Sequence, residues 1–130
     1  MQKSVSASSI LLAEDEYLIV EMLQGALQEA GFDIVCARNG DQATKEIEED
    51  VGRFVGIITD AHLAAGPDGW HIARRARELA PAIPVIYITG AAAAEWACHG
   101  VPNSVLITKP FVPAQVITAI AGLMNQGDVC

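Results

Sequence analysis

Residues 55–60 read VGIITD, an apolar run that ends in an aspartate. A run without polar alternation is typical of a strand buried on both faces, as in a parallel sheet covered by helices. Similar short apolar runs occur elsewhere, and a polar residue follows each of them. They are ILLA at 10–13 before Glu14 and Asp15, PVIYI at 84–88 before Thr89, and VLIT at 105–108 before Lys109 and Pro110. The sequence therefore predicts parallel strands with polar side chains at their carboxyl ends.

Segments with apolar residues at helical spacing separate these runs. They cover residues 18–30, the stretch opened by Asn39-Gly40-Asp41, the stretch after the turn GPDG at 66–69, residues 91–99, and the stretch from Pro113. Gly31 suits the left-handed position after the first helix, and Asp41 is expected to cap the second. Residues 33–37 predict a further, weaker strand. This repeated alternation predicts an α/β protein with an open parallel sheet and helices on both sides.

Composition limits the class of protein. The chain has 130 residues, which suits a single domain. Its net charge of −8 disfavours direct binding to nucleic acid or to an anionic membrane, because both attract basic surfaces. No signal peptide or membrane-length apolar run is present, and the three cysteines lack a disulfide framework, so a reduced, cytoplasmic protein is expected. Cys98 and His99 are adjacent, which is not a spacing of zinc ligands.

The polar residues at the strand ends predict one pocket. In an open parallel sheet, ligands bind outside the carboxyl ends of the strands, so these residues are expected to converge. Glu14, Asp15 and Asp60 offer the oxygen ligands that Mg²⁺ prefers. Asp60 can also act as a nucleophile, while Lys109 and the Thr89 hydroxyl can contact phosphoryl oxygens. The set suits phosphoryl transfer, which requires mainly positioning and charge neutralisation.

The chain resembles the CheY-like receiver domain of two-component response regulators, of the stand-alone type. The motifs that carry the resemblance are LLAEDE at 11–16, Asp60 with Asp68-Gly69 downstream, YITG at 87–90, and KPF at 109–111. The resemblance implies a flavodoxin-like (βα)5 doubly wound sheet of strand order 2-1-3-4-5 in three layers. Residues 9–125 are expected to form the receiver domain, between a short extension at 1–8 and a tail at 126–130.

The resemblance also implies roles for individual residues. Asp60 would accept a phosphoryl group from a histidine kinase or phosphotransfer protein, with Mg²⁺ held by Glu14, Asp15, Asp60 and the backbone carbonyl of His62. Thr89 would move onto the phosphoryl group, Lys109 would contact it, and the Lys109–Pro110 bond would be cis. The protein would not be an enzyme beyond self-catalysed phosphorylation and dephosphorylation. It would signal through a downstream protein, and a homodimer through the fourth helix, fifth strand and fifth helix is allowed.

Two features depart from the family pattern. Many receivers carry an aromatic switch residue three positions before the lysine, where this chain has Leu106. The segment at 64–67 lacks the usual proline soon after the aspartate and is one residue longer than the common form. We therefore expect a different coupling of Thr89 to the surface and a differently shaped loop over the site.

Other functions remain open at this stage. The domain could belong to a hybrid kinase or phosphorelay, or serve as a phosphate sink. An aspartyl-phosphate phosphatase usually has a second aspartate two residues after the nucleophile, where this chain has His62. A nucleotide or flavin module would need a glycine-rich loop after the first strand, where three acidic residues stand instead. An unphosphorylated scaffold of the same shape is the fourth alternative.

Several residues outside the pocket allow two interpretations. His62 could alter the lifetime of the acyl phosphate, or it could be an exposed loop residue that contributes only its backbone carbonyl. Trp96 could anchor a partner or lie partly in the core. Trp70 is expected to pack on the sheet. The arginines at 74, 75 and 77 are expected to form a solvated helix face, and Glu95 carries no functional signal.

Overall fold

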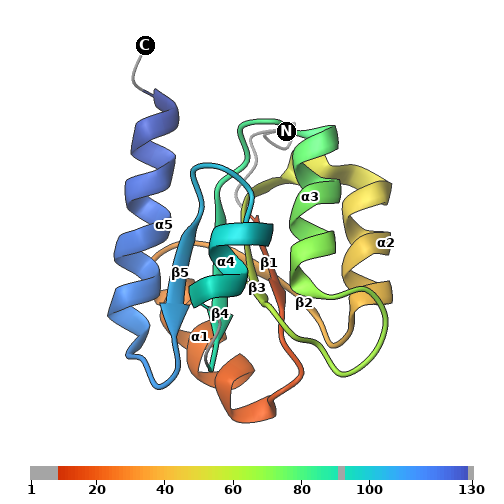
Figure 1. Cartoon of the computed structure of the whole chain (residues 1–130). Helices are drawn as coiled ribbons and strands as arrows, with labels where there is room; N and C mark the ends of the chain where they lie inside the picture. The colour runs from red at the N-terminus through yellow and green to blue at the C-terminus, as the bar shows by residue number, and fades with distance from the viewer. Residues whose placement is uncertain (1–8, 91–92, 129–130) are drawn as a thin grey trace.

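The computed structural model describes residues 9–90 and 93–128 (Figure 1). The expected N-terminal extension, the predicted start of the fourth helix at Ala91 and the end of the tail fall outside these residues. Strands and helices alternate along the chain. The elements are β1 (Ser9–Ala13), α1 (Tyr17–Glu29), β2 (Asp33–Ala37), α2 (Gly40–Asp50), the short 3-10 helix η1 (Val51–Arg53), β3 (Phe54–Asp60), α3 (Gly69–Leu79), β4 (Val85–Thr89), α4 (Ala93–His99), β5 (Val105–Thr108) and α5 (Pro113–Asp128).

The strands form one parallel sheet of order β2-β1-β3-β4-β5, which confirms the predicted fold. The register places Ala13 beside Thr59, Thr59 beside Tyr87, and Tyr87 beside Leu106. The strands β1, β3, β4 and β5 therefore end within two residues of one another at the same edge of the sheet. In Figure 1 the loops after β1, β3 and β5 all lie at the lower end of the sheet. This edge is where the polar residues predicted to form a pocket must lie.

Helices cover both faces of the sheet, and each face has its own core. Because successive side chains of a strand point to opposite faces, Leu11 and Ala13 join one core while Ile10 and Leu12 join the other. The first core lies under α2 and α3, and the second under α1 and α5. Trp96 of α4 packs against the first core. Burial of both faces explains why the strand sequences show no polar alternation.

The start of α2 differs from the prediction that Asp41 caps this helix. The residue that caps α2 is Asn39, whose side-chain Oδ1 accepts a hydrogen bond from the Gln42 backbone N–H at 2.9 Å. Asp41 instead lies in the first turn, where a carboxylate is favoured by the helix dipole. Asp68 caps α3 in the same way, accepting from the His71 backbone N–H at 3.0 Å. Both caps follow the usual preference for short polar side chains with extended backbone.

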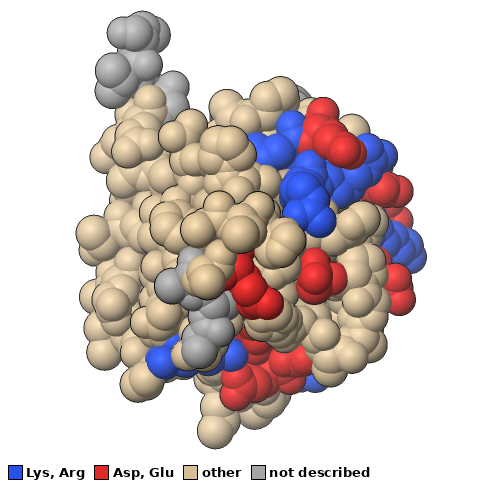
Figure 2. All heavy atoms as spheres, viewed as in Figure 1, with Lys and Arg blue, Asp and Glu red and all other residues tan. Residues whose placement is uncertain are grey.

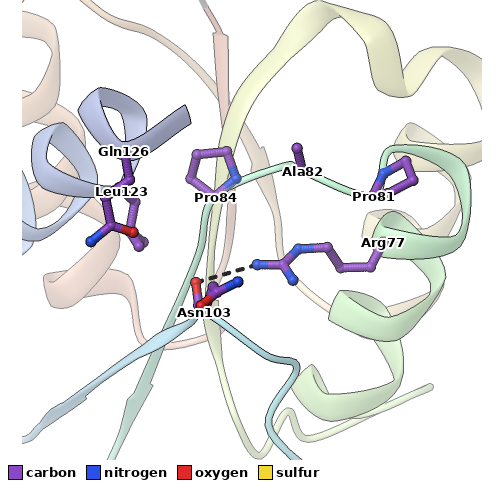
Figure 3. A pocket seen from close by; sticks show the side chains of 7 residues that line it. All are labelled: Arg77, Pro81, Ala82, Pro84, Asn103, Leu123 and Gln126. Atoms are coloured by element: carbon purple, nitrogen blue, oxygen red, sulfur yellow. Dashed lines mark hydrogen bonds between the residues drawn. The ribbon is translucent and has the colours of Figure 1, made fainter. Parts of the chain in front are cut away.

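The prediction of a solvated arginine face on α3 is wrong for Arg77. Arg74 is exposed and Arg75 pairs with Glu48 and Glu78, but the guanidinium of Arg77 points inward. It donates to the carbonyl oxygens of Ile83 at 2.7 Å, Pro102 at 2.6 Å and Asn103 at 3.4 Å. Arg77 thereby ties α3 to the segments before β4 and β5. It also lines a pocket of about 240 Å³ at the amino-terminal end of the sheet (Figure 3).

None of the described helices is both long enough and apolar enough to cross a membrane. Cys36 and Cys98 are free, exposed thiols.

Candidate functional site

Carboxylates gather at the carboxyl end of the sheet. Glu14 and Asp15 directly follow β1, and Asp60 is the last residue of β3. One oxygen from each of the three side chains lies within 4.8 Å of the others. Glu14 is fully buried and Asp60 is 6% exposed. The strand ends therefore bring together the acidic residues that the sequence placed in one pocket.

Lys109 supplies the positive charge of this cluster. Its Nζ donates to Asp60 Oδ2 at 3.1 Å and to Glu16 Oε1 at 2.6 Å, and it lies 3.8 Å from Glu14 Oε1. Burial lowers the pKa of Lys109, but its hydrogen bonds to Glu16 and Asp60 outweigh burial and hold the pKa above its usual value. The Lys109–Pro110 peptide bond is cis, as expected from the family resemblance. A cation therefore faces Asp60 directly, although carboxylates still outnumber it.

Glu14 is the residue of the cluster whose ionised form is disfavoured by its surroundings. Burial, followed by the charge of Asp60, raises its pKa from 4.5 to about 7, against the lowering effect of the Glu16 backbone N–H. That N–H donates to Glu14 Oε2 at 3.1 Å, whereas the buried Oε1 has no hydrogen-bond partner in the described part of the chain. Such an orphaned acceptor, beside two further carboxylates, fits a hard divalent cation with oxygen ligands.

Glu14→Gln is expected to stabilise the metal-free protein at pH 8 by about 2 kcal/mol and to change its stability little at pH 4.5. The folded-state pKa of Glu14 is raised, so its protonated form contributes stability below pH 4.5 that is lost as the pH rises through 7. Urea denaturation with EDTA at both pH values measures the effect. Glu29→Gln, at the exposed end of α1, is the matched control. An equal gain at both pH values would contradict the explanation.

The loop after β3 closes over the cluster. The Ala64 backbone N–H donates to Asp15 Oδ2 at 2.9 Å, which joins this loop to the end of β1. Gly66 has a φ of +80°, so the segment at 64–67, expected to be unusual, bends at a glycine in the left-handed region. At its end Gly69 lies against the backbone of Asp60, and its N–H donates to the Ala61 carbonyl at 2.9 Å. The loop therefore has a defined path that places Asp15 and Asp60 beside each other.

Thr89 and His62 border the same site. Thr89 ends β4 and is 2% exposed, and its backbone carbonyl accepts from the Lys109 N–H at 2.8 Å. The His62 backbone N–H donates to Asp60 Oδ1 at 2.9 Å, while the exposed imidazole Nε2 lies 2.7 Å from Glu95 Oε1 on α4. Every predicted site residue therefore lies at this end of the sheet.

Two residues at the site were missed by reasoning from the sequence. Glu95, for which the sequence gives no functional signal, links α4 to His62 in the loop after β3. Glu16 was read only as part of an acidic motif, yet it is the nearest partner of Lys109. The LLAEDE motif holds a signal for Glu16, because the residue after Asp15 also follows β1. Nothing in the sequence around position 95 signals the contact with His62.

An aromatic cluster lies behind the site. The rings of Trp70 and Tyr87 are 4.6 Å apart, and Trp70 also approaches His62 at 6.4 Å and His99 at 6.2 Å. Tyr87 is fully buried, and its hydroxyl accepts from the Val101 backbone N–H at 3.1 Å. Trp70 thus packs on the sheet as expected. Trp96 is half-buried, and its Nε1 donates to Ser104 Oγ at 3.0 Å, so the interpretation as partial core is confirmed.

A five-stranded parallel sheet of order 2-1-3-4-5 with an acidic cluster at its carboxyl edge defines a CheY-like receiver protein. The chain belongs to the response regulator receiver domain family, which matches residues 10–121. Its relatives include the response regulator receiver protein CpdR of Brucella abortus, 37% identical over 65% of this chain and 68% of that protein. The phosphate regulon regulator PhoB of Pseudomonas aeruginosa is 30% identical over 91% of this chain. The chain spans about half of PhoB, 52% of its length.

Solved structures support the same assignment. A response regulator receiver protein from Sinorhizobium medicae is 41% identical, with a TM-score of 0.88 over 94% of this chain and 98% of that chain. The receiver domain of the sensor histidine kinase PA1611 from Pseudomonas aeruginosa is 23% identical and has a TM-score of 0.77 over 92% of this chain and 98% of that chain. That structure has a magnesium ion coordinated in its active site cleft. At this identity the PA1611 domain shows the fold alone.

Proposed function

We propose that this receiver domain is a phosphorylation-dependent signalling switch whose phosphoacceptor is Asp60. The observation that carries the proposal is the position of Asp60. Its Oδ2 accepts a hydrogen bond from Lys109 Nζ at 3.1 Å, and its side chain is grouped with those of Glu14 and Asp15. The donor is a phosphohistidine of a histidine kinase or phosphotransfer protein. The chemistry is self-catalysed transfer to Asp60 followed by hydrolysis, and no external substrate is turned over.

The side chains of the site have distinct roles in this proposal. An oxygen of Asp60 forms the new bond to phosphorus, while the bond from phosphorus to the donor nitrogen breaks and the donor leaves with the electron pair. Lys109 neutralises the charge on the phosphoryl oxygens. The Thr89 hydroxyl, buried at the end of β4, donates to one of those oxygens once the strand end has moved inward. The loop tied by Ala64 to Asp15 keeps the acceptor in place.

Mg²⁺ is the cofactor of the proposal. Glu14, Asp15, Asp60 and the backbone carbonyl of His62 would hold it. The buried, unpartnered Glu14 Oε1 and the three grouped carboxylates support this assignment. When bound, the ion neutralises the charge that develops on the transferred phosphoryl group.

Two surfaces of the domain suit the binding of protein partners. The side chains of Leu18, Met22 and Val112 are exposed apolar groups on α1 and the loop after β5, beside the site, and suit the approach of a kinase or phosphotransfer protein. The second surface covers α5, where Figure 2 shows almost no charge. The sequence of α5 contains one charged residue, Asp128 at its end, and the sequence of β5 contains none. We propose that α4, β5 and α5 form the output surface toward a downstream protein or a second copy of this chain.

His62→Ala is expected to change the rate of phospho-Asp60 hydrolysis modestly, by about two- to threefold. His62 lies two residues from Asp60, and its imidazole contacts Glu95. In the proposed role the imidazole restricts the approach of water to the phosphoryl group. The decay of radiolabelled phosphoprotein measures the rate, and Glu95→Gln is the companion variant that weakens the same contact. An unchanged decay rate in both variants would remove His62 from this role.

Intact-mass spectrometry after incubation with acetyl phosphate tests the function. We expect a single phosphoryl adduct in the presence of Mg²⁺ and none with EDTA. The same assay with a phosphorylated phosphotransfer protein covers a site that accepts only from a protein donor. Absence of the adduct with both donors would contradict the proposal and leave a scaffold of receiver shape.

A further inference from the structure

Lys109 is held between carboxylates on two sides. Asp60 lies on the buried side, with 3.1 Å between Lys109 Nζ and Asp60 Oδ2. Glu16 lies on the solvent side, with 2.6 Å between Lys109 Nζ and Glu16 Oε1. The side chain of Lys109 is 21% exposed and that of Glu16 is 56% exposed. The nearest anion to the ammonium is therefore a residue outside the acceptor and metal set.

The position of Glu16 is fixed by its backbone. Glu16 is the residue before α1, with φ −85° and ψ 113°, and its N–H is bonded to Glu14 Oε2. From there its side chain lines a crevice of about 460 Å³ between α1 and the loop after β5. Ile19, Met22 and Phe111 provide the apolar walls of the crevice. Glu16 thus reaches Lys109 from the surface where a phosphodonor must approach.

We propose that Glu16 is a competing carboxylate that acts through Lys109 and weakens the hold of the site on a phosphoryl group. The inference rests on the proposed function, because it names a residue that regulates the same site. In the unphosphorylated protein Lys109 is shared between Glu16 and Asp60. A phosphoryl group on Asp60 draws the ammonium inward, and Glu16 loses its partner and returns to the crevice.

Competition of Glu16 for Lys109 has a larger effect than any benefit from Glu16 holding Lys109 in position, for a physical reason. Lys109 has three N–H donors, so its hydrogen bond to Asp60 does not depend on Glu16. The carboxylate of Glu16, in contrast, adds negative charge beside a site that already holds Glu14, Asp15 and Asp60. Both the repulsion of the incoming anion and the sharing of Lys109 oppose phosphoryl binding. Because Glu16 is exposed, the effect is modest, about two- to fivefold.

Beryllofluoride binding at saturating Mg²⁺ tests the inference without any group transfer. Fluorine NMR and titration of intrinsic fluorescence measure its affinity, with Asp60→Asn as the baseline. We expect Glu16→Gln to bind about two- to fivefold more tightly than the wild type. Glu16→Asp, which keeps the charge, is expected to bind like the wild type. Glu29→Gln removes one charge from the far end of the same helix and is expected to leave the affinity unchanged.

A kinetic measurement separates this role from a structural one. With acetyl phosphate, Glu16→Gln is expected to lower the half-saturating donor concentration while leaving the maximal rate unchanged. A defect in folding would lower the maximal rate instead. Equal or weaker beryllofluoride binding by Glu16→Gln would overturn the inference while the proposed function stands. Failure of the wild type to bind beryllofluoride through Asp60 would overturn both.

Discussion

Asp60→Asn is expected to abolish the Mg²⁺-dependent phosphoryl adduct. An amide does not attack phosphorus, while the new side chain keeps the shape of aspartate and its Oδ1 can still accept from the His62 N–H. The exchange also removes one negative charge from a buried, crowded cluster, so the folded state should be no less stable than that of the wild type. Loss of the adduct would therefore reflect chemistry and not unfolding.

The measurement compares intact masses after incubation with acetyl phosphate and Mg²⁺. Asp50→Asn is the matched control, because it makes the same change at an exposed residue at the end of α2. We expect the control to be labelled as fully as the wild type. An adduct that persists in Asp60→Asn, on the same timescale, would show that another residue accepts the phosphoryl group.

Gly69→Ala is expected to destabilise the protein by about 3 kcal/mol, the upper end of the range for overpacking. A Cβ at this position would lie 2.2 Å from the Asp60 carbonyl oxygen and 2.9 Å from the Ala61 Cα. Both atoms belong to the backbone, so no side chain can rotate to make room. The start of α3 would have to move away from the end of β3, and Asp60 would move with it. Labelling by acetyl phosphate should fall together with stability.

Gly25→Ala is the control for this prediction. Gly25 lies within α1, and a Cβ there would meet open space. Alanine is a better helix former than glycine, so this variant should be more stable by about 0.5–1 kcal/mol. Urea denaturation of both variants measures the two effects. A loss of stability in Gly69→Ala no greater than about 0.5 kcal/mol would contradict the steric argument.

The fold could be predicted because its strands are simple to read. β3 and β4 are apolar along most of their length, since helices cover both faces, and the strand at Val105–Thr108 was predicted with its observed bounds. The site followed from the same pattern, because Asp60 and Thr89 end their strands and Lys109 directly follows β5. A parallel sheet brings such positions to one edge without any knowledge of the side-chain conformations.

The details that depend on side-chain direction could not be predicted. Asn39 and Asp41 are both good caps, and the backbone conformation selects Asn39. Arg77 and Glu95 reach partners about 25 and 33 residues away in the chain. No local pattern specifies which way such a long side chain turns, because the partner is supplied by the packing of another segment.

The contact between the tilted rings of Trp70 and Tyr87 has a practical consequence. The indole of Trp70 is 4% exposed and also faces the imidazoles of His62 and His99, both of which can quench its excited state. Its emission therefore depends on the distances from Trp70 to His62 in the loop after β3 and to His99 at the end of α4. In a Trp96→Phe background this single fluorophore would report the geometry of the loop beside Asp60 in real time. The chain thus contains an optical sensor of its own state, with no attached label.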